Sequence, residues 1–348
     1  MTPLQWYRTA TLALTQRLSN LPRRLRLLLG RGRRLMRIDA NSAEIATYRA
    51  MLNDNLCAPA IYSAGTFWDQ INKDFADLIW SGALRDLRNQ YFSRRFAAWD
   101  PHDRTAYRCL LRLYREQLRA RDTEGFLDQE SDPMEGGADD QENIDGRRVS
   151  LDFLQSVDEA LSIKEAWRLS GRGNGPRLLV ELGAGYGRLA YVMCRMFPEC
   201  TYVICDLPEA LACADSWLSR VLPGKVVPYA ESRGVTSFSR ETLISRKCWI
   251  LGAHQIEALP SNSLDAFVNI YSFAEMPRTT IAHYFKEIDR VTRGVVFIKQ
   301  RKREENLQDA VIVTADSYPV PTTWQPVFFR TTPLYEEFFE AAWSTGLK

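Results

Sequence analysis

The chain has 348 residues, 45% of them hydrophobic, and its net charge is only +2. This length exceeds one ordinary core, so we expect a large and a smaller domain, and the near-neutral charge argues against a general nucleic-acid-binding protein. No apolar run approaches the ~20 residues that span a bilayer. The seven cysteines include no Cys-x-x-Cys pair, which fits reduced thiols in a cytoplasmic protein.

The basic charge is concentrated at the amino terminus. Residues 1–40 contain nine arginines and one acid, Asp39, with leucines among the arginines. A segment of this kind can lie on an anionic membrane surface or bind an acidic partner. It can equally be a solvated tail, so peripheral membrane contact through this basic N-terminal tail is one of two open interpretations.

Residues 41–170 are predicted to form a helical N-terminal region, because apolar residues recur there every three or four positions. One helix ends near Ser81, a second covers 84–99, a third begins at Asp100 and a fourth covers 151–169. The apolar stripes of the first and third helices are Phe67, Ile71, Phe75 and Leu78, and Tyr107, Leu110, Leu111, Tyr114 and Leu118. Their aromatic rings belong to the core or line an acceptor cleft.

An acidic segment interrupts this helical region. Residues 122–145 hold ten acids and no basic residue, together with Pro133 and Gly136-Gly137. Such a composition buries little apolar surface. We therefore expect an exposed acidic loop or linker at 122–145.

Short apolar strands alternate with helices in residues 171–348. This alternation predicts a Rossmann-like α/β sheet, whose ligands bind at the carboxyl ends of the strands. Strands are expected at 177–182, 201–206, 248–253, 264–271 and 294–299, and helices at 186–197, 208–222 and 278–290. Two further apolar segments, 310–314 and 327–330, suit antiparallel strands at the sheet edge.

A glycine motif follows the first of these strands. Gly183, Gly185 and Gly187 allow the chain to turn and its backbone to approach a ligand at the start of the next helix. Asp206 ends the second strand, 21 residues after Gly185, where Rossmann-type folds place the carboxylate that accepts the ribose hydroxyls. These features predict a nucleoside-cofactor site, and a glycine turn without a cofactor is the alternative.

Two details favour S-adenosylmethionine (SAM) over a dinucleotide. The glycines are spaced Gly-x-Gly-x-Gly, and Glu181 lies in the strand just before them. An acid at this position would repel a pyrophosphate, whereas it suits the sulfonium and ammonium groups of SAM. The expected cofactor is therefore SAM.

Longer sequence runs point to a family. These runs are 181–191, 206–210, 253–260 and 269–277, with 65–68, 82–89 and 144–150 in the helical region. They resemble a bacterial family of sugar O-methyltransferases among the class I SAM-dependent enzymes. The resemblance spans about residues 60–340 and implies a class I SAM methyltransferase sheet after a helical region, with a sugar or glycan as the acceptor.

The resemblance also implies roles for single residues, in part through their backbone atoms. Those around the methionine part of SAM would be Glu181, Gly183, Gly185 and Tyr186, with Gly187 completing the turn. Those around the nucleoside would be Asp206 and Leu207 at the ribose and Gln255 and Ile256 at the adenine. Asn269 and Tyr271 would lie near the transferring methyl group.

A hydroxyl acceptor needs a base to remove its proton. His254 is the one histidine expected at a strand end beside the cofactor, and Glu275 follows the fourth strand on the acceptor side, which favours Glu275 slightly. Each also has a structural interpretation, His254 as a loop residue and Glu275 as a helix-start cap. No spacing typical of metal ligands accompanies them, so no metal is expected. Tyr318 and Trp324 either pack against a sugar ring or cover the sheet edge.

The sequence thus favours a SAM-dependent O-methyltransferase acting on a sugar or glycan. Methylation of a non-sugar small molecule and a non-catalytic SAM-binding or scaffold role are the two alternatives.

Overall fold

The computed structural model describes residues 43–89, 104–137, 139–173, 175–306, 311–332 and 335–346. The basic tail and the predicted helix start at Asp100 lie outside these residues. The described chain separates into two compact units, one of Trp80–Asp158 and one of Ala40–Ile79 with Glu159–Lys348. This division differs from the predicted boundary at residue 170. Within the described residues, no helix has both the length and the apolar character needed to cross a membrane.

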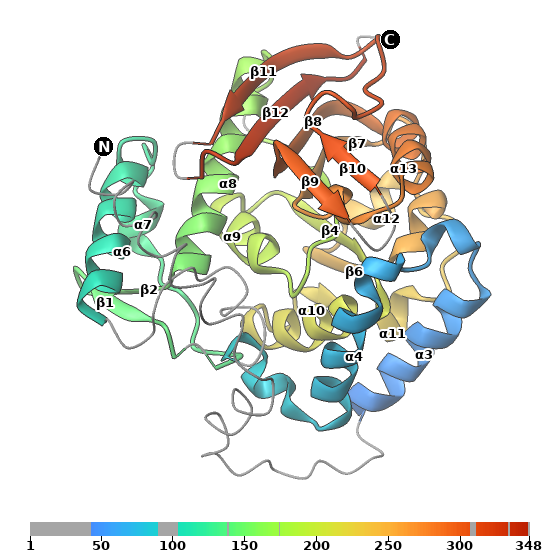
Figure 1. The fold of residues 1–348 in the computed structure, drawn as a ribbon, viewed down its shortest axis with the longest axis horizontal. Helices are drawn as coiled ribbons and strands as arrows, with labels where there is room; N and C mark the ends of the chain where they lie inside the picture. Colours follow the sequence, from blue (N-terminus) through green and yellow to red (C-terminus); the bar gives the residue numbers. More distant parts are fainter. Residues whose placement is uncertain are drawn as a thin grey trace. The chain divides into compact units, whose positions relative to one another are not determined.

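The larger unit is built on an eight-stranded sheet with the order β11-β12-β8-β7-β3-β4-β6-β5 (Figure 1). The strands are β3 (Leu178–Leu182), β4 (Thr201–Asp206), β5 (Val226–Val227), β6 (Cys248–Gly252), β7 (Leu264–Ile270), β8 (Thr292–Arg301), β11 (Gln325–Thr331) and β12 (Phe338–Ser344). Neighbours from β5 to β8 are parallel, whereas β12 is antiparallel to both β8 and β11. This topology is that of the Rossmann-like class I SAM methyltransferase sheet, which confirms the predicted fold class.

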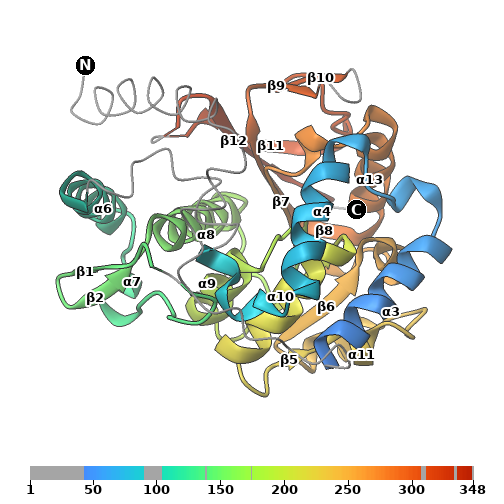
Figure 2. The same cartoon turned by 60° about the horizontal axis from the view of Figure 1, so that its bottom comes forward.

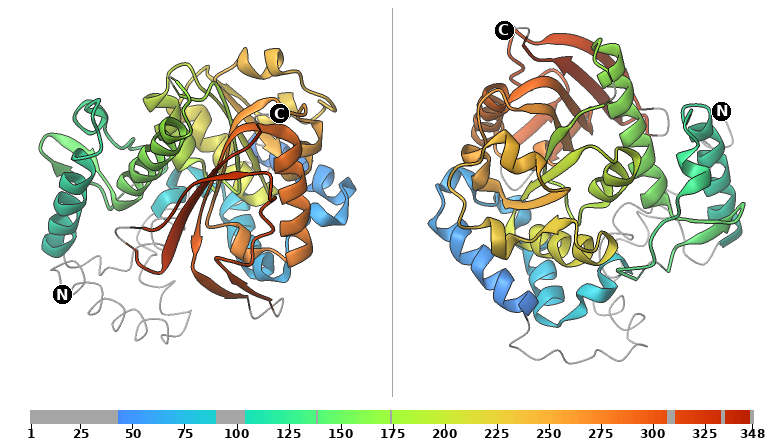
Figure 3. Two further views of the ribbon diagram at one scale, coloured as in Figure 1. Left: turned by 90° about the horizontal axis from the view of Figure 1, so that it is seen from above. Right: turned by 180° about the vertical axis from the view of Figure 1, so that it is seen from behind.

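The central strands are covered on both faces, which explains their nearly continuous apolar sequences. Every residue of β3, β4, β6 and β7 is buried. One face packs on α12 (Arg240–Ile244) and α13 (Arg278–Val291). Helices α8 (Leu151–Leu169), α9 (Arg188–Met196) and α10 (Pro208–Val221) belong to the other face, and Figure 3 shows α8 in green and α13 in orange on opposite sides of the strands.

The first described helices join the sheet unit through side-chain hydrogen bonds. They are α3 (Ala43–Cys57), η1 (Ala60–Tyr62) and α4 (Thr66–Trp80). Tyr48 donates to Glu209 Oε1 over 3.1 Å, and Tyr229 donates to Asp54 Oδ2 over 2.9 Å, which places α3 beside α10 and α11 (Tyr229–Ser232; Figure 2). These bonds explain why residues 43–79 belong with the sheet. In α4, Phe75 and Leu78 are buried as predicted, while the side chains of Phe67 and Ile71 lie outside the described set.

The carboxyl-terminal strands correct one expectation. Strand β10 (Val311–Thr314) pairs with β9 (Arg303–Asn306) in a separate two-stranded sheet instead of lying at the edge of the large one. Strand β11 forms the edge, and the unpredicted strand β12 lies between β8 and β11. Strand β12 carries the buried acid Glu340, whose carboxylate accepts from Ser162 and pairs with Arg330. Because Glu340 interrupts the apolar residues of this segment, its sequence does not show the pattern expected of a strand.

The smaller unit corrects the expected acidic loop. It contains η2 (Ala83–Asp86), α6 (Arg104–Arg119), α7 (Phe126–Gln129) and the hairpin of β1 (Glu142–Ile144) and β2 (Arg147–Val149). Buried Arg115 of α6 pairs with Asp128 and Asp145, each over 2.7 Å. Arg88 pairs with buried Asp132 over 2.8 Å. The acidic segment is therefore ordered, because arginines distant in sequence neutralise it.

Candidate active site

The glycine motif makes a tight turn where β3 ends. Gly183 has φ 76°, and its N–H donates to the carbonyl oxygen of Cys205 in β4 over 2.9 Å. A Cβ atom at Gly183 would overlap the side chain of Ser272, which follows β7. Gly185 is also left-handed, with φ 60°. The turn therefore needs glycine both for its backbone conformation and for its close packing.

Asp206 lies next to this turn, at the carboxyl end of β4. Its Oδ2 atom accepts the N–H of Gly185 over 2.8 Å, and its Oδ1 atom accepts the N–H of Leu207 over 2.7 Å. Burial raises the pKa of Asp206 to about 7, although these backbone donors lower it. Each carboxylate oxygen offers two acceptor positions, so both retain one for a further donor. The carboxyl group can thus accept a pair of ribose hydroxyls while it holds the glycine turn.

Glu181 is the second buried acid of the site. It lies in β3, two residues before Gly183, and its Oε2 atom accepts a 2.7 Å hydrogen bond from the phenol of Tyr202 in β4. Burial raises the pKa of Glu181 to about 8, and the charges of Glu159 and Asp206 add to this shift. Removing acids from water favours their neutral forms. A cationic ligand beside these two acids would stabilise their ionised forms.

A buried ion-pair cluster connects three elements on the α8 side of the sheet. Glu159 of α8 pairs with Arg188 at the start of α9 over 2.7 Å and with Lys299 of β8 over 3.1 Å. Burial tends to raise the pKa of Glu159, but its two cationic neighbours outweigh that effect and lower it. Because Arg188 directly follows Gly187, the cluster anchors the end of the glycine turn.

Asn269 lies at the end of β7 and is fully buried. Its Nδ2 atom donates to the carbonyl oxygen of Leu182 over 2.9 Å and to Ser272 Oγ over 2.6 Å. Its Oδ1 atom accepts from Gln300 Nε2 over 2.6 Å. The side chain thus ties together the ends of β3, β7 and β8. Its predicted role near the methyl group would be exerted through this backbone arrangement.

The segment after β6, η4 (Ala253–Ala258), contains the two residues predicted at the adenine. Gln255 Oε1 accepts the N–H of Gly252 over 2.9 Å, and its Nε2 atom donates to the carbonyl oxygen of Ser232 over 3.0 Å. The side chain of Ile256 is part of the core beneath the sheet. Both side chains therefore shape the segment, which leaves backbone atoms for ligand contact.

Tyr186 and Leu207 flank the strand ends differently. The ring of Tyr186 is buried and packs edge-on against Trp217 of α10, with centroids 4.9 Å apart. Leu207 is half-buried and is the N-cap residue of α10. The Tyr186 ring supports the glycine turn from the α10 side.

The two candidate bases occupy ends of different strands. His254 follows β6, whereas Glu275 ends η5 (Phe273–Glu275) after β7, and β4 and β3 lie between these strands. Three strand spacings separate the ends by about 14 Å. Burial lowers the pKa of His254, and its Nδ1 atom is buried without a hydrogen-bond partner among the described residues. The two side chains cannot act as a directly bonded pair.

Tyr271 follows β7 with φ 64°, a left-handed conformation that costs about 1–2 kcal/mol in a residue other than glycine. Its N–H donates to the carbonyl oxygen of Lys299 over 2.9 Å, and Lys299 Nζ lies 5.5 Å from its ring centroid. Burial raises the pKa of its phenol. At neutral pH this phenol remains protonated, so it can donate a hydrogen bond but cannot act as a base.

Tyr318 and Trp324 cover the sheet edge. Both rings stack on Phe285 of α13, with centroid distances of 6.1 and 5.9 Å, and Trp324 Nε1 donates to Asp289 over 2.8 Å. Both residues are buried. Their packing accounts for them without a sugar ring.

Sequence reasoning missed the partners that hold the predicted residues in place. Tyr202 binds Glu181, Ser272 packs on Gly183, and Glu159 binds Arg188. Strands β3 and β4 pair in parallel with Leu179 opposite Tyr202, so Glu181 lies two residues further along the same face as Tyr202. Such a register becomes readable once two strands are known to be neighbours. Among the described residues, no three His, Cys, Asp or Glu side chains gather as potential metal ligands.

No family model and no curated protein matches this chain. Several solved structures are similar to it. The pyocyanin biosynthetic protein PhzM has a TM-score of 0.36 at 15% identity over 56% of this chain and 57% of its own. Human N-acetylserotonin methyltransferase in complex with SAM has a TM-score of 0.34 at 14% identity over 56% of each chain. Geranyl diphosphate C-methyltransferase from Streptomyces coelicolor A3(2) has a TM-score of 0.38 at 11% identity over 56% of this chain and 81% of its own.

The chain thus spans little more than half the length of PhzM and of the human enzyme. At these identities and TM-scores, the likenesses do not identify an activity.

Proposed function

We propose that this protein is a SAM-dependent O-methyltransferase whose acceptor is a hydroxyl group of a sugar or glycan. The observation that carries the proposal is the position of Asp206. Its carboxyl group is held by the amides of Gly185 and Leu207 and keeps an acceptor position on each oxygen. That arrangement suits a ribose with two free hydroxyls.

The surrounding residues fit the rest of SAM. Glu181 supplies a buried carboxyl group beside the turn, where an ammonium or sulfonium charge would offset the cost of ionising it. The Gly-x-Gly-x-Gly turn offers backbone atoms at the ligand's side without side chains to exclude it. When bound, SAM supplies a methyl group already activated by its sulfonium.

The remaining task of this chain is to orient the acceptor and receive its proton. Orientation of two reactants can contribute about 7–11 kcal/mol in favourable cases. Glu275 is our candidate for the base, because it follows β7, which adjoins the glycine-turn strand β3. Removal of the proton by a positioned carboxylate contributes about 10²–10⁴-fold in rate. The Glu159 cluster holds Arg188, and with it the end of the turn.

The sugar or glycan acceptor is supported by the flanking sequence runs 65–68, 82–89 and 144–150, which resemble the sugar O-methyltransferase family. A hydroxyl of a non-sugar small molecule would use the same cofactor site and the same base.

The test has two stages on the full-length protein. Calorimetry measures the binding of SAM and S-adenosylhomocysteine, and radiolabelled SAM is then offered with free sugars, nucleotide-linked sugars, glycans and phenols. Methyl transfer to a carbohydrate supports the proposal. Methyl transfer to phenols alone would mean that the acceptor is a non-sugar small molecule. SAM binding without any methyl transfer would favour a non-catalytic role. Failure to bind SAM would reject the proposal.

A further inference from the structure

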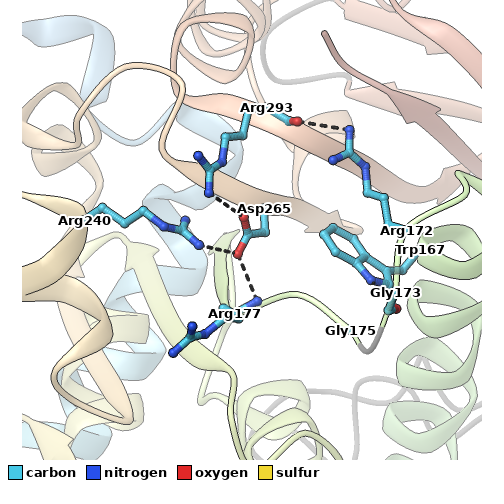
Figure 4. A pocket seen from close by; sticks show the side chains of 8 residues that line it. All are labelled: Trp167, Arg172, Gly173, Gly175, Arg177, Arg240, Asp265 and Arg293. Carbon is cyan, nitrogen blue, oxygen red and sulfur yellow. Dashed lines mark hydrogen bonds and ion pairs between the residues drawn. The ribbon is translucent and has the colours of Figure 1, made fainter. Parts of the chain in front are cut away.

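A pocket lies at the amino-terminal ends of the strands, whereas the glycine turn lies at their carboxyl ends. It has a volume of about 570 Å³, and its residues adjoin the amino-terminal ends of β3, β7 and β8 (Figure 4). The pocket is lined by Trp167, Arg172, Gly173, Gly175, Arg177, Arg240, Asp265 and Arg293. Four arginines and one acid give this lining a net charge of +3.

The single acid is already neutralised within the pocket. Asp265 Oδ2 accepts the backbone N–H groups of Arg177 and Leu178 over 2.9 and 3.0 Å. The same oxygen pairs with Arg240 over 2.7 Å, and Oδ1 pairs with Arg293 over 3.3 Å. Asp265 therefore holds the side chains of Arg240 and Arg293 and the backbone of Arg177, as Figure 4 shows, and its own charge is fully engaged.

Donors remain for a ligand. The Arg177 guanidinium has no hydrogen-bond or ion-pair partner among the described residues, and the residue is exposed. Arg172 donates from Nη2 to the carbonyl oxygen of Arg293 over 3.1 Å, while its Nε atom is buried without a hydrogen bond to any described residue. Arg293 uses one of its five N–H donors on Asp265. The lining contains no second acid that could pair with these unused donors.

Trp167 adds a rigid wall. Its Nε1 atom donates to the carbonyl oxygen of Gly173 over 2.9 Å, and the Arg172 guanidinium carbon lies 5.5 Å from its ring centroid. Stacking on the indole orients the Arg172 fork. The pocket thus presents planar guanidinium groups, of which those of Arg172, Arg240 and Arg293 are held in place, and such groups match the oxygens of a phosphate better than ammonium groups would.

We infer that this pocket binds the phosphate group of a small anionic ligand, at a site separate from the proposed cofactor site. The shared chemistry is a phosphate with at least two free oxygens, whether it comes from an inorganic phosphate or from a nucleotide. The inference is independent of the proposed methyl transfer, because it rests on residues at the other ends of the strands.

Calorimetry of the full-length protein tests the inference with two probes, inorganic pyrophosphate and uridine diphosphate. Equal affinity for both identifies phosphate alone as the ligand, and tighter binding of the diphosphate nucleoside identifies a nucleotide. Both results support the site. Binding should weaken as salt is raised, because the groups are partly exposed.

Variants locate the binding. Arg177→Ala should weaken pyrophosphate binding by about tenfold or more, since a charged hydrogen-bonding group is lost, and Arg177→Lys should restore part of it. Arg177 contributes to Asp265 through its backbone N–H, so both variants keep that bond. Lys302→Ala is the matched control, because it removes the same charge from an exposed residue. Lys302 lies just beyond the carboxyl end of β8, at the opposite end of that strand from the pocket. The inference is overturned if neither probe binds, if Arg177→Ala binds like the wild type, or if Lys302→Ala weakens binding equally.

Discussion

The Oδ2 atom of Asp206 accepts a 2.8 Å hydrogen bond from the backbone N–H of Gly185. This bond joins the end of β4 to the glycine turn after β3, so one carboxyl group both fixes the turn and faces the proposed ribose position. Changes at Asp206 should therefore affect the cofactor more than any other single substitution in the site.

Asp206→Ala should weaken SAM binding by about 10–150-fold, which corresponds to about 1.5–3 kcal/mol for a hydrogen bond to a charged group. Calorimetry measures the affinity, and thermal unfolding establishes that the variant is folded. Asp215→Ala is a matched control, because Asp215 is also buried, also has a raised pKa of about 6 and accepts one backbone N–H, from Tyr229. Equal losses in the two variants would contradict the assigned role of Asp206.

The raised pKa of Asp206 predicts a pH dependence of nucleoside binding. Burial places this pKa at about 7, so the free protein holds the carboxyl proton below that pH. Acceptance of two ribose hydroxyls requires the ionised form, so binding must release the proton. Adenosine has no group that titrates near neutral pH, so its binding isolates this effect. Its affinity should fall about tenfold for each pH unit below 7 and level off above it.

The Asp206→Ala variant is the control for this titration, since its adenosine affinity should not follow the same curve. A wild-type affinity that is constant from about pH 5.5 to 8.5 would mean that Asp206 does not receive the ribose.

The packing of Gly183 against Ser272 predicts a specific stability coupling. Gly183→Ala should destabilise the protein by about 2–5 kcal/mol, because a left-handed alanine costs about 1–2 and overpacking about 1–3 kcal/mol. Ser272→Gly in the same chain removes the overlapping side chain, so the double variant should lose less stability than the sum of the single variants. Urea unfolding of all four proteins measures this coupling. Additive losses would show that the overlap does not govern the turn.

The local part of the site was readable from the sequence. The glycine turn and Asp206 depend on signals within a few residues of each other, namely short apolar strands that end in glycine or in an acid. The strand order then follows from the fold class. The positions of Gly183, Gly185 and Asp206 at neighbouring strand ends required no knowledge of distant contacts.

Contacts between distant residues were not readable in this way. The acidic segment 122–145 resembled a solvated loop, because nothing local indicates that Arg115 neutralises Asp128 and Asp145. Strand β12 was missed since its buried Glu340 is satisfied by Ser162, 178 residues away in the chain. The arginine-lined pocket likewise gathers residues from 167 to 293. In each case a charged residue that the sequence alone would place in solvent is paired with a residue distant in the chain.

The choice between the two candidate bases depends on their different strand ends. Glu275→Gln should lower single-turnover methyl transfer by about 10²–10⁴-fold while SAM affinity stays nearly unchanged, because a base acts only on the acceptor proton. His254→Gln should leave the rate nearly intact, because His254 follows β6, which is separated from β7 by β3 and β4. Melting temperatures of both variants control for folding. Normal turnover in Glu275→Gln would remove it as the base.

Calorimetry of the wild-type protein with SAM, followed by titration of NAD⁺ into the SAM complex, tests whether the glycine turn binds SAM. We predict one SAM site per chain and no displacement of bound SAM by NAD⁺, because a cationic ligand beside Glu181 favours the ionised carboxylate, which a pyrophosphate would not do. Displacement of SAM by NAD⁺, or binding of neither ligand, would contradict the account.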